Sequence, residues 1–301
     1  MKKKYLVIVV ILVILLIIFI FFIKNRNKDP YQFKGNTLYY SENRQTDYEI
    51  LSKSSNDSFE LYKIRFKSKQ FLEEKTEIYG LLFIPKEKEA TPGIVFLPAG
   101  GGTKESRAEI AIKISKLGYA VLVIDQRGIG ETGGTYLGIE QDYQIFSQGK
   151  EPIQHLSVYD VLKAYDVLRE FKDERINKEK IGIAGESMGA RYGIIAAAID
   201  QRIKGVIVIS SAGFHININP LQKGNDYFVS IDPDHYIEEI DGFVMMLHGT
   251  NDSVVSLNDA QITFSKAKEP KRFFIAQGCQ HGYCEKMFEE LKKGLEMMLG
   301  E

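Results

Sequence analysis

A serine between two glycines is the residue of this sequence best placed to act as a nucleophile. Ser187 is the middle residue of the Gly-Glu-Ser-Met-Gly stretch at 185–189, which lies between an apolar run at 180–184 and an apolar, helix-like stretch at 190–198. A strand-turn-helix of this kind holds the serine in a strained backbone conformation, and small flanking residues let strand and helix approach closely. The alternative is a structural turn whose serine caps the helix. The context of the motif decides between the two interpretations.

A serine hydroxyl needs a neighbouring base, because it is a poor nucleophile near neutral pH. Of the five histidines, His281 follows the last predicted strand and precedes the last predicted helix. A histidine in that loop can reach back over the sheet towards Ser187. His248 instead ends a predicted strand, where its role can be limited to shaping the next turn. We therefore predict that His281 is the general base.

The base in turn needs a carboxylate that orients its ring. Asp252 follows the penultimate predicted strand, in the turn His-Gly-Thr-Asn-Asp at 248–252. Aspartate in such a turn commonly accepts hydrogen bonds from nearby backbone amides, so a purely local role is the alternative. However, Ser187, Asp252 and His281 each follow a separate predicted strand, and their order along the chain is that of α/β-hydrolase triads. We predict that these three residues form a catalytic triad.

Ester or amide cleavage also needs donors for the negative oxygen of the tetrahedral intermediate. The amide of Met188 directly follows the serine and lies at a predicted helix start, where the helix dipole helps. Glycines at 100–102 follow an earlier predicted strand, and their amides can face a ligand without obstruction by side chains. A flexible connector or a phosphate cradle is the alternative, but no Lys-Ser or Lys-Thr pair closes the loop as in a P-loop. We expect Met188, Gly100 and Gly101 to supply the oxyanion donors.

A second group of glycines, at 128–133, matches the Gly-x-Gly-x-x-Gly pattern of dinucleotide-binding loops. In those loops the pattern opens a helix, whereas here more glycine and threonine follow at 133–138. We therefore expect a rigid turn beside the site and no nucleotide cofactor. Arg127 either binds a substrate carboxylate or, as we prefer, pairs with Asp125 or another acid and braces this loop.

The hydrophobic pattern predicts alternating strands and helices over most of the chain. Stretches 58–67 and 76–84 look like an antiparallel pair, and the helix at 157–171 has Ser157 as its predicted cap. Further strands are expected at 93–97, 119–124, 180–184, 204–209, 242–247 and 271–276, with helices at 103–117, 188–198, 257–267 and 284–298. Because the later strands are continuously apolar, the pattern predicts an α/β fold with a mainly parallel central sheet and helices on both faces. Reactive residues of such sheets gather at the carboxyl ends of the strands.

The first 24 residues are predicted to be a membrane anchor. Residues 5–23 contain no charge, glycine or proline, and as a helix they would be about 28 Å long, close to the hydrocarbon thickness of a bilayer. A cleaved signal peptide would have a shorter apolar region that ends in small residues, whereas this run ends in Phe-Ile-Phe-Phe-Ile. Lysines at 2–4 outweigh the downstream basic residues, which Asp29 dilutes, so the catalytic domain is expected outside the cytoplasm. Residues 25–57 are predicted to be a tether and irregular segment, followed by a catalytic domain at 58–301.

Composition excludes some functions. The 301 residues include 39 basic and 40 acidic residues, a net charge of −1, so no basic field is available to bind nucleic acid. Two cysteines are too few for a disulfide framework or a zinc site. Cys279 and Cys284 bracket His281, and form either a disulfide, if the domain lies outside the cytoplasm, or two free thiols. The proposed chemistry needs no metal or organic cofactor, and the sequence does not indicate an oligomeric state.

Two long stretches between predicted strands have no assigned secondary structure. Residues 211–236 contain several aromatic and aliphatic side chains, and form either a small cover over an acyl pocket or a surface excursion. Residues 132–154 are expected to form a second wall.

Together these motifs resemble the α/β-hydrolase superfamily over about residues 58–299. Within it the chain looks most like the branch of dienelactone-hydrolase-like, acetyl-xylan-esterase-like and prolyl-oligopeptidase-like catalytic domains, in which the acid lies in a similar His-Gly-x-x-Asp turn. Lipases and many esterases carry His-Gly-Gly-Gly at the oxyanion loop, whereas here Pro98 and Ala99 precede the glycines. Dienelactone hydrolases proper use cysteine at the position of Ser187.

The resemblance and the motifs imply a membrane-anchored serine hydrolase that acts on carboxylic esters through an acyl-enzyme intermediate. Its partners would be a small-molecule ester and, through residues 5–23, the lipid bilayer. A serine peptidase or amidase of the prolyl oligopeptidase type is the first alternative, although no propeller domain is present in the sequence. The second is an inactive hydrolase fold that serves as a binding module.

Overall fold

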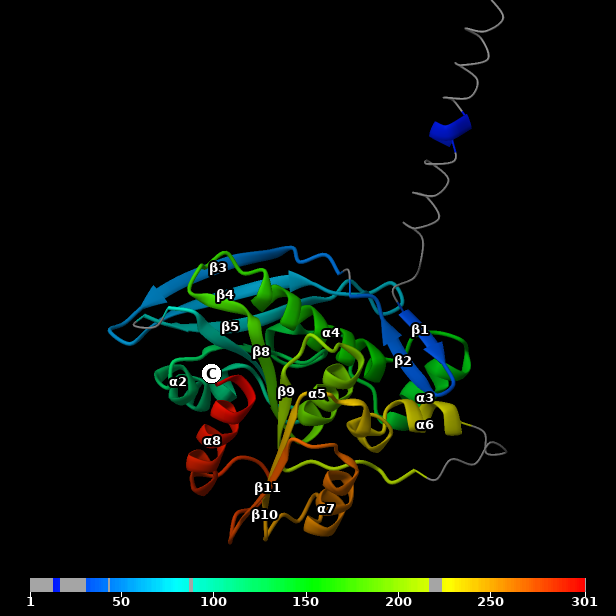
Figure 1. Ribbon diagram of the computed structural model, residues 1–301. Coiled ribbons are helices and arrows are strands. Elements are labelled where there is room, and N and C mark those ends of the chain that lie inside the picture. The colour runs from blue at the N-terminus through cyan, green and yellow to red at the C-terminus, as the bar shows by residue number, and fades with distance from the viewer. Residues whose placement is uncertain (1–12, 17–30, 43, 87–88, 217–223, 301) are drawn as a thin grey trace, which may run out of the picture.

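The computed structural model describes residues 13–16, 31–42, 44–86, 89–216 and 224–300 (Figure 1). Of the predicted span at 5–23, only residues 13–16 belong to these ranges. Within them, no helix has the length and apolar character needed to cross a membrane.

A nine-stranded sheet forms the centre of the molecule, in the order β11-β10-β9-β8-β6-β7-β5-β4-β3. The six strands from β11 to β7 in this order pair in parallel, whereas β5, β4 and β3 add to the edge in antiparallel fashion. This confirms the mainly parallel sheet and the antiparallel pair that the sequence predicts. The strands are β3 (Tyr48–Ser55), β4 (Phe59–Lys67), β5 (Glu77–Pro85), β6 (Thr91–Leu97), β7 (Ala120–Ile124), β8 (Ile176–Glu186), β9 (Gly205–Ile209), β10 (Phe243–Gly249) and β11 (Lys271–Ala276).

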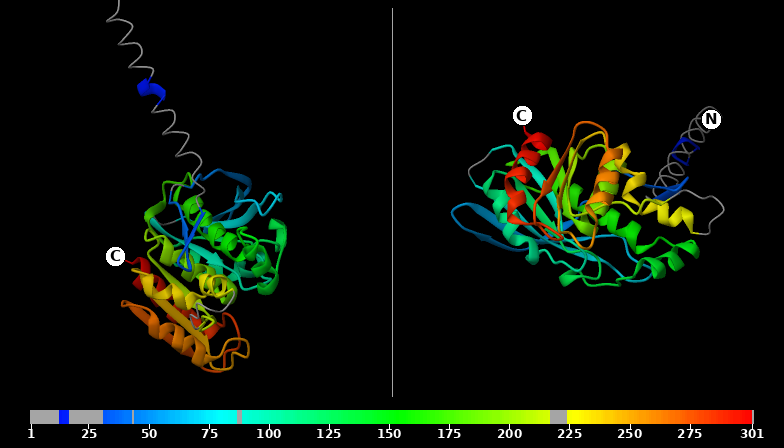
Figure 2. Two further views of the ribbon diagram at one scale, coloured as in Figure 1. Left: turned by 90° about the vertical axis from the view of Figure 1, so that its right-hand side faces the viewer. Right: turned by 90° about the horizontal axis from the view of Figure 1, so that it is seen from below.

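Helices cover both faces of the sheet, because its central strands are apolar on both sides. Helices α2 (Ala108–Lys116) and α8 (Phe288–Leu299) pack on one face, and α4 (Ile153–Arg169), α5 (Ser187–Ile199) and α7 (Leu257–Lys266) pack on the other. Figure 2 shows α8 in red and α7 in orange on opposite sides of the strands. Successive residues of one strand therefore enter different cores, as Val95 and Phe96 of β6 do.

The segment predicted to be irregular at 25–57 contains three strands, which corrects that prediction from residue 31 onward. Strands β1 (Tyr31–Lys34) and β2 (Thr37–Tyr40) form a separate hairpin, and β3 pairs with β4 in the main sheet. Strand β3 is exposed at most positions, so its sequence lacks the alternating apolar pattern by which a half-buried strand is recognised. The hairpin is held by buried Leu38 and Tyr40, whose partners are distant in the sequence.

Helix α4 begins four residues earlier than predicted. Its N-cap is Pro152, and the Ser157 hydroxyl donates instead to the carbonyl of Ile153 inside the helix, at 2.9 Å. The prediction of Ser157 as a cap is therefore wrong. Nearly every residue of α4 is buried, including the polar Gln154 and His155 of its first turn, so polar side chains there do not mark a solvent-exposed segment before the helix.

The two long stretches between strands pack on each other beyond the sheet. Helix α3 (Ile139–Ser147) belongs to the first and α6 (Asn225–Ser230) to the second. The ring of Tyr143 lies against those of Tyr227 and Phe228, and the Tyr227 hydroxyl donates to buried Asp142 at 2.9 Å. Part of the 211–236 stretch is thus fixed by aromatic contacts to the 132–154 stretch.

Candidate active site

The turn between β8 and α5 is a sharp strand-to-helix elbow with Ser187 at its tip. Ser187 has a φ of +49°, which a residue with a Cβ adopts only under strain. A Cβ on Gly185 would lie 2.9 Å from the amide nitrogen of Ala190, and one on Gly189 would lie 2.3 Å from the carbonyl oxygen of Pro98. Both glycines are therefore required for the close approach of strand, helix and neighbouring loop.

Asp252 lies in the turn after β10, and its carboxylate is held by three donors. The backbone amides of Val254 and Val255 each donate to Oδ1 at 2.9 Å, and His281 Nδ1 lies 3.0 and 2.9 Å from the two carboxylate oxygens. The Asp252 side chain has no exposed surface. Burial acts to raise its pKa, but the amides of Val255 and Val254 and the His281 ring outweigh burial and lower it.

The His281 ring is oriented so that its two nitrogens have different roles. Nδ1 faces the carboxylate and is therefore the protonated nitrogen of the neutral ring, which leaves Nε2 with its lone pair. Among the described residues, Nε2 makes no hydrogen bond, and 23% of the side chain is exposed. His281 can thus accept a proton from a group that approaches on its open side.

Hydrogen bonds from two neighbouring serine hydroxyls after β9 bring the elbow and the histidine loop to the same edge of the sheet. The Ser211 hydroxyl after β9 donates to the carbonyl of Ser187 at 2.9 Å, and the neighbouring Ser210 hydroxyl donates to the carbonyl of Gly282 at 3.4 Å. The Ser187 hydroxyl itself makes no hydrogen bond within the part of the chain that the structure describes. The structure therefore pairs Asp252 with His281 and places Ser187 at the same edge, without a direct bond from the serine to the ring.

A disulfide links Cys279 and Cys284 across the histidine loop. The structure therefore has the disulfide and not the alternative of two free thiols. The same loop is tied to the aspartate turn, because the amide of Asn251 donates to the carbonyl of Cys279 at 2.9 Å. The backbone on both sides of His281 is therefore held, which limits the motion of its ring.

The glycine loop after β6 lies against the elbow. A Cβ on Gly100 would be 3.4 Å from the Met188 side chain, and Gly101 has a φ of +76° that favours glycine. Gly102 closes a turn by donating to the carbonyl of Ala99 at 2.9 Å. Of the three predicted oxyanion donors, Gly100 thus lies beside Met188, and Gly101 is the next residue in the chain.

Two ion pairs brace the loops that carry the site. Arg127 makes a bidentate contact with Asp160 of α4, at 2.6 and 2.8 Å, and both side chains are buried. Asp125 instead accepts from the amide and the Nζ of buried Lys104, at 2.8 and 2.9 Å. The bracing role of Arg127 is confirmed, with Asp160 as its acid. The nearby Gly130–Thr132 forms only a 3₁₀ turn.

An ion pair directly beside Ser187 was not predicted from the sequence. Glu186, the last residue of β8, is 1% exposed, and its Oε2 accepts from Arg107 Nε at 2.6 Å. Arg107 follows the glycine loop and lies in η1 (Glu105–Arg107). A charged residue directly after the uncharged run 181–185 was the available signal for this pair.

No group of three or more His, Cys, Asp or Glu side chains is arranged to hold a metal ion within the described ranges.

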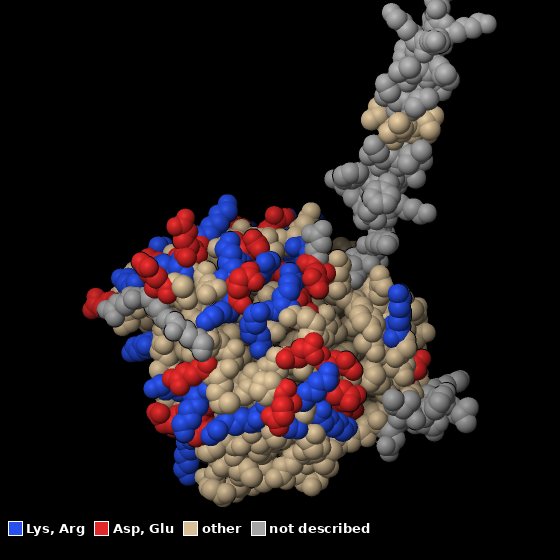
Figure 3. Space-filling model, viewed as in Figure 1, with Lys and Arg blue, Asp and Glu red and all other residues tan. Residues whose placement is uncertain are grey.

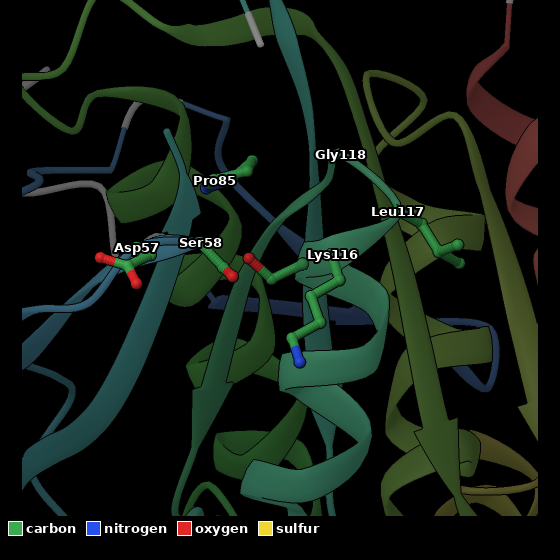
Figure 4. A pocket seen from close by; sticks show the side chains of 7 residues that line it. Asp57, Ser58, Pro85, Lys116, Leu117 and Gly118 are labelled. Atoms are coloured by element: carbon green, nitrogen blue, oxygen red, sulfur yellow. The ribbon is translucent and has the colours of Figure 1, made fainter. Parts of the chain in front are cut away.

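A pocket of about 480 Å³ lies at the opposite end of the sheet, between the β3–β4 turn and the end of α2 (Figure 4). Its lining includes Asp57, Ser58, Pro85 and Lys116, and none of the predicted site residues. Lysine, arginine, aspartate and glutamate are interspersed on the face in Figure 3, so this face has no large field of one sign.

A mainly parallel sheet with a strained serine elbow and a histidine–aspartate pair at the strand ends defines an α/β-hydrolase. The model of the dienelactone hydrolase family matches residues 78–293, and the chain therefore belongs to that family.

Individual proteins resemble the chain more distantly. The uncharacterized protein YfhR of Escherichia coli K12 is 23% identical over 209 residues, which cover 66% of this chain and 67% of YfhR. Among solved structures, the acetyl xylan esterase from Paenibacillus sp. R4 superposes with a TM-score of 0.69 at 16% identity, covering 85% of this chain and 90% of that one. The glucuronoyl esterase from Solibacter usitatus gives a TM-score of 0.63 at 14% identity, with 90% and 89% covered. These likenesses support the fold.

Proposed function

We propose that the chain is a serine hydrolase that cleaves carboxylic esters, with Ser187 as nucleophile, His281 as base and Asp252 as the acid that orients His281. The observation that carries the proposal is the contact of buried Asp252 with His281 Nδ1, at the strand-end edge where strained Ser187 stands. This contact leaves Nε2 free for the serine hydroxyl.

The proposed reaction has two steps. His281 Nε2 takes the proton of Ser187 while Oγ bonds to the ester carbonyl carbon, and the same proton then passes to the leaving alcohol as the C–O bond breaks. Water, deprotonated by His281, releases the acid and restores the serine. The amides of Met188 and of Gly100 or Gly101 bind the oxyanion. One such donor typically contributes about 3–4 kcal/mol to stabilisation of the transition state.

The substrate is proposed to be an ester with a short acyl group. Structural neighbours are named as acetyl xylan and glucuronoyl esterases, which favours esters of sugars or sugar acids. Arg191 lies one helical turn after Ser187, 4.7 Å from the Phe214 ring, and makes no ion pair within the described residues. Esters with a negatively charged group near the scissile bond are therefore proposed to be preferred over neutral ones.

The domain is proposed to be held at a membrane by residues 5–23 and to lie outside the cytoplasm. The disulfide supports this location, because structural disulfides persist mainly in oxidising compartments. Protease treatment of intact cells and of opened cells tests it. Digestion of the domain only after opening would contradict the proposed location.

The hydrolase proposal is tested with the full-length chain in non-ionic detergent. Wild type should hydrolyse p-nitrophenyl acetate and react with a fluorophosphonate probe, and Ser187→Ala should lose both activities. Ser265→Ala, an exposed hydroxyl on α7, is the matched control and should retain both. Undiminished labelling of Ser187→Ala contradicts the proposal, and no labelling of folded wild type favours the inactive module. Faster cleavage of an amide than of the ester with the same acyl group favours the peptidase.

A further inference from the structure

Glu186 is a buried carboxylate directly before the proposed nucleophile, and only one of its oxygens is satisfied. Oε2 accepts from Arg107, whereas Oε1 is buried without a hydrogen-bond partner in the described part of the chain. A buried, half-satisfied carboxylate costs stability, since most buried polar atoms in native proteins find partners. Its presence at this position therefore calls for an explanation beyond packing.

Glu186 lies where the three parts of the proposed site meet. It belongs to the nucleophile elbow, and Arg107 connects it to the segment that follows the glycine loop. Burial raises the pKa of Glu186, and Arg107, the backbone of Tyr283 and the ring of His281 act against that rise, so the histidine loop lies near its other side. The bond between Ser210 and Gly282 independently places that loop beside the elbow.

We propose that Glu186 is a positioning residue of the hydrolytic site, which holds the glycine loop through Arg107 and stabilises the positive charge that His281 acquires during catalysis. This inference rests on the function proposed above. As a second carboxylate near the ring, Glu186 adds to Asp252, because a negative charge nearby favours the imidazolium form of histidine.

The charges around this cluster are few, so the electrostatic effect can be attributed. His281 faces Asp252 from the β10 turn, with buried His248 3.5 Å behind that carboxylate, and Glu186 from the elbow. Glu186 in turn faces Arg107 and Tyr283.

Further out, Tyr283 contacts Glu285, and Lys113 pairs with both Glu285 and Glu109 on the surface. Burial raises the pKa of Tyr283, and Glu285, Glu109 and Glu186 raise it further, so this phenol stays neutral in the working range. Titration of Tyr283 therefore does not compete with the effect expected at His281.

The test is the pH profile of kcat/KM for p-nitrophenyl acetate with the full-length chain. Glu186→Gln keeps the shape of the side chain and removes its charge. The acid limb of the profile is the part in which kcat/KM rises with pH as His281 loses its proton. Glu186→Gln should move this limb to lower pH by roughly 0.5–1 unit. The variant should also lower kcat with little change in KM, and Glu186→Asp should return the limb towards wild type.

Asp160→Asn is the matched control, because Asp160 is equally buried and paired with an arginine, Arg127, but lies on α4. It should lower stability and leave the acid limb in place. If Glu186→Gln does not fold, Arg107→Gln carries the test. It removes the cation that opposes the effect of burial, favours the neutral carboxyl form of Glu186 and should therefore move the limb to lower pH, as Glu186→Gln does.

An unmoved limb in every folded variant of Glu186 and Arg107 overturns the inference. So does a shift of the same size in Asp160→Asn. Either result can occur while wild type is active and Ser187→Ala is inactive, so it is distinguishable from a failure of the proposed hydrolase function.

Discussion

Two histidine–aspartate pairs are hydrogen-bonded in the described part of the chain, and their differences show what sets the proposed catalytic pair apart. His281 and Asp252 come from the loops after β11 and β10, and His215 and Asp234 lie in the 211–236 stretch after β9. In both pairs Nδ1 is hydrogen-bonded to the carboxylate, at 2.9 Å in the first and 2.5 Å in the second. Contact between the two side chains therefore does not distinguish them.

The carboxylates differ in their other partners. Among the described residues, Asp252 accepts hydrogen bonds from two backbone amides and from His281, and no lysine or arginine pairs with it, so its charge is available to the ring. Asp234 accepts also from Thr263 at 2.7 Å and from Lys266 at 2.8 Å, and the lysine neutralises it. The second pair thus fastens the loop after β9 to α7.

The Nε2 atoms of the two histidines, which do not contact the paired aspartate, differ even more in their surroundings. Nε2 of His281 makes no hydrogen bond among the described residues, and its ring lies at the edge of the sheet that carries Ser187. Nε2 of His215 is buried without a hydrogen bond and lies 3.4 Å from a carboxylate oxygen of Asp259. A histidine acts as base only where its second nitrogen faces a group that gives up a proton, and His215 faces an acceptor instead.

The largest effect is expected when each histidine is replaced by glutamine. His281→Gln should lower kcat for p-nitrophenyl acetate by about 10⁵-fold or more, because the base is lost and only binding and oxyanion donors remain. His215→Gln should keep kcat within about threefold of wild type and lose about 1–2 kcal/mol of stability. Steady-state kinetics and urea unfolding of the full-length chain measure both. An equal loss of kcat in the two variants would mean that the pairs do not differ as argued.

The next largest effect is expected for the two aspartates. Asp252→Asn should lower kcat by about 10⁴-fold, because an amide no longer holds the His281 tautomer and no longer stabilises the imidazolium. Asp234→Asn should retain activity and lose about 1–3 kcal/mol of stability, since Lys266 is left beside an uncharged partner. Kinetics and unfolding of both variants give the result. Retention of more than a tenth of the wild-type kcat in Asp252→Asn would remove Asp252 from the site.

Sequence predicted the proposed site better than its surroundings. Ser187, Asp252 and His281 could be found because each follows an apolar strand, and the topology of a parallel sheet brings strand ends together. The contact between Asp252 and His281 is present as expected. Glu186 was not singled out, because its significance depends on Arg107, 79 residues earlier.

The same reason explains the errors in the fold. Strand β3 is an exposed edge, and the β1–β2 hairpin is stabilised by contacts such as that of Leu38 with Tyr236, 198 residues away. The expected pairing of Arg127 with an acid is present, and Asp160 rather than neighbouring Asp125 is the partner, since Lys104 pairs with Asp125. Local sequence patterns predict strands that have apolar faces. The hydrogen-bond and ion-pair partners of polar groups cannot be predicted in this way, because they depend on the folded arrangement.

The disulfide sharpens the comparison, because of the two pairs it restrains the one proposed to be catalytic. Cys279 and Cys284 bracket His281, whereas His215 has no such link in the described residues. Replacing both cysteines with serine should lower stability by about 2 kcal/mol and lower kcat severalfold through a less constrained His281. Alkylation with and without prior reduction verifies the bond in wild type. An unchanged kcat would show that the hydrogen bonds of the loop alone position the ring.

The smallest expected effect is a pH dependence of stability that depends on Asp234. Burial acts to raise its pKa, but Lys266, Thr263 and His215 outweigh burial and lower it. A carboxyl group whose folded pKa is below its unfolded value, about 3.9, stabilises the fold above that value and loses this contribution as the pH falls through the folded pKa. The difference in unfolding free energy between wild type and Asp234→Asn should therefore be constant from pH 7 to about 5 and shrink below about 4. Urea unfolding across this range measures it, and a difference that grows on acidification would show that the Asp234 pKa is raised rather than lowered.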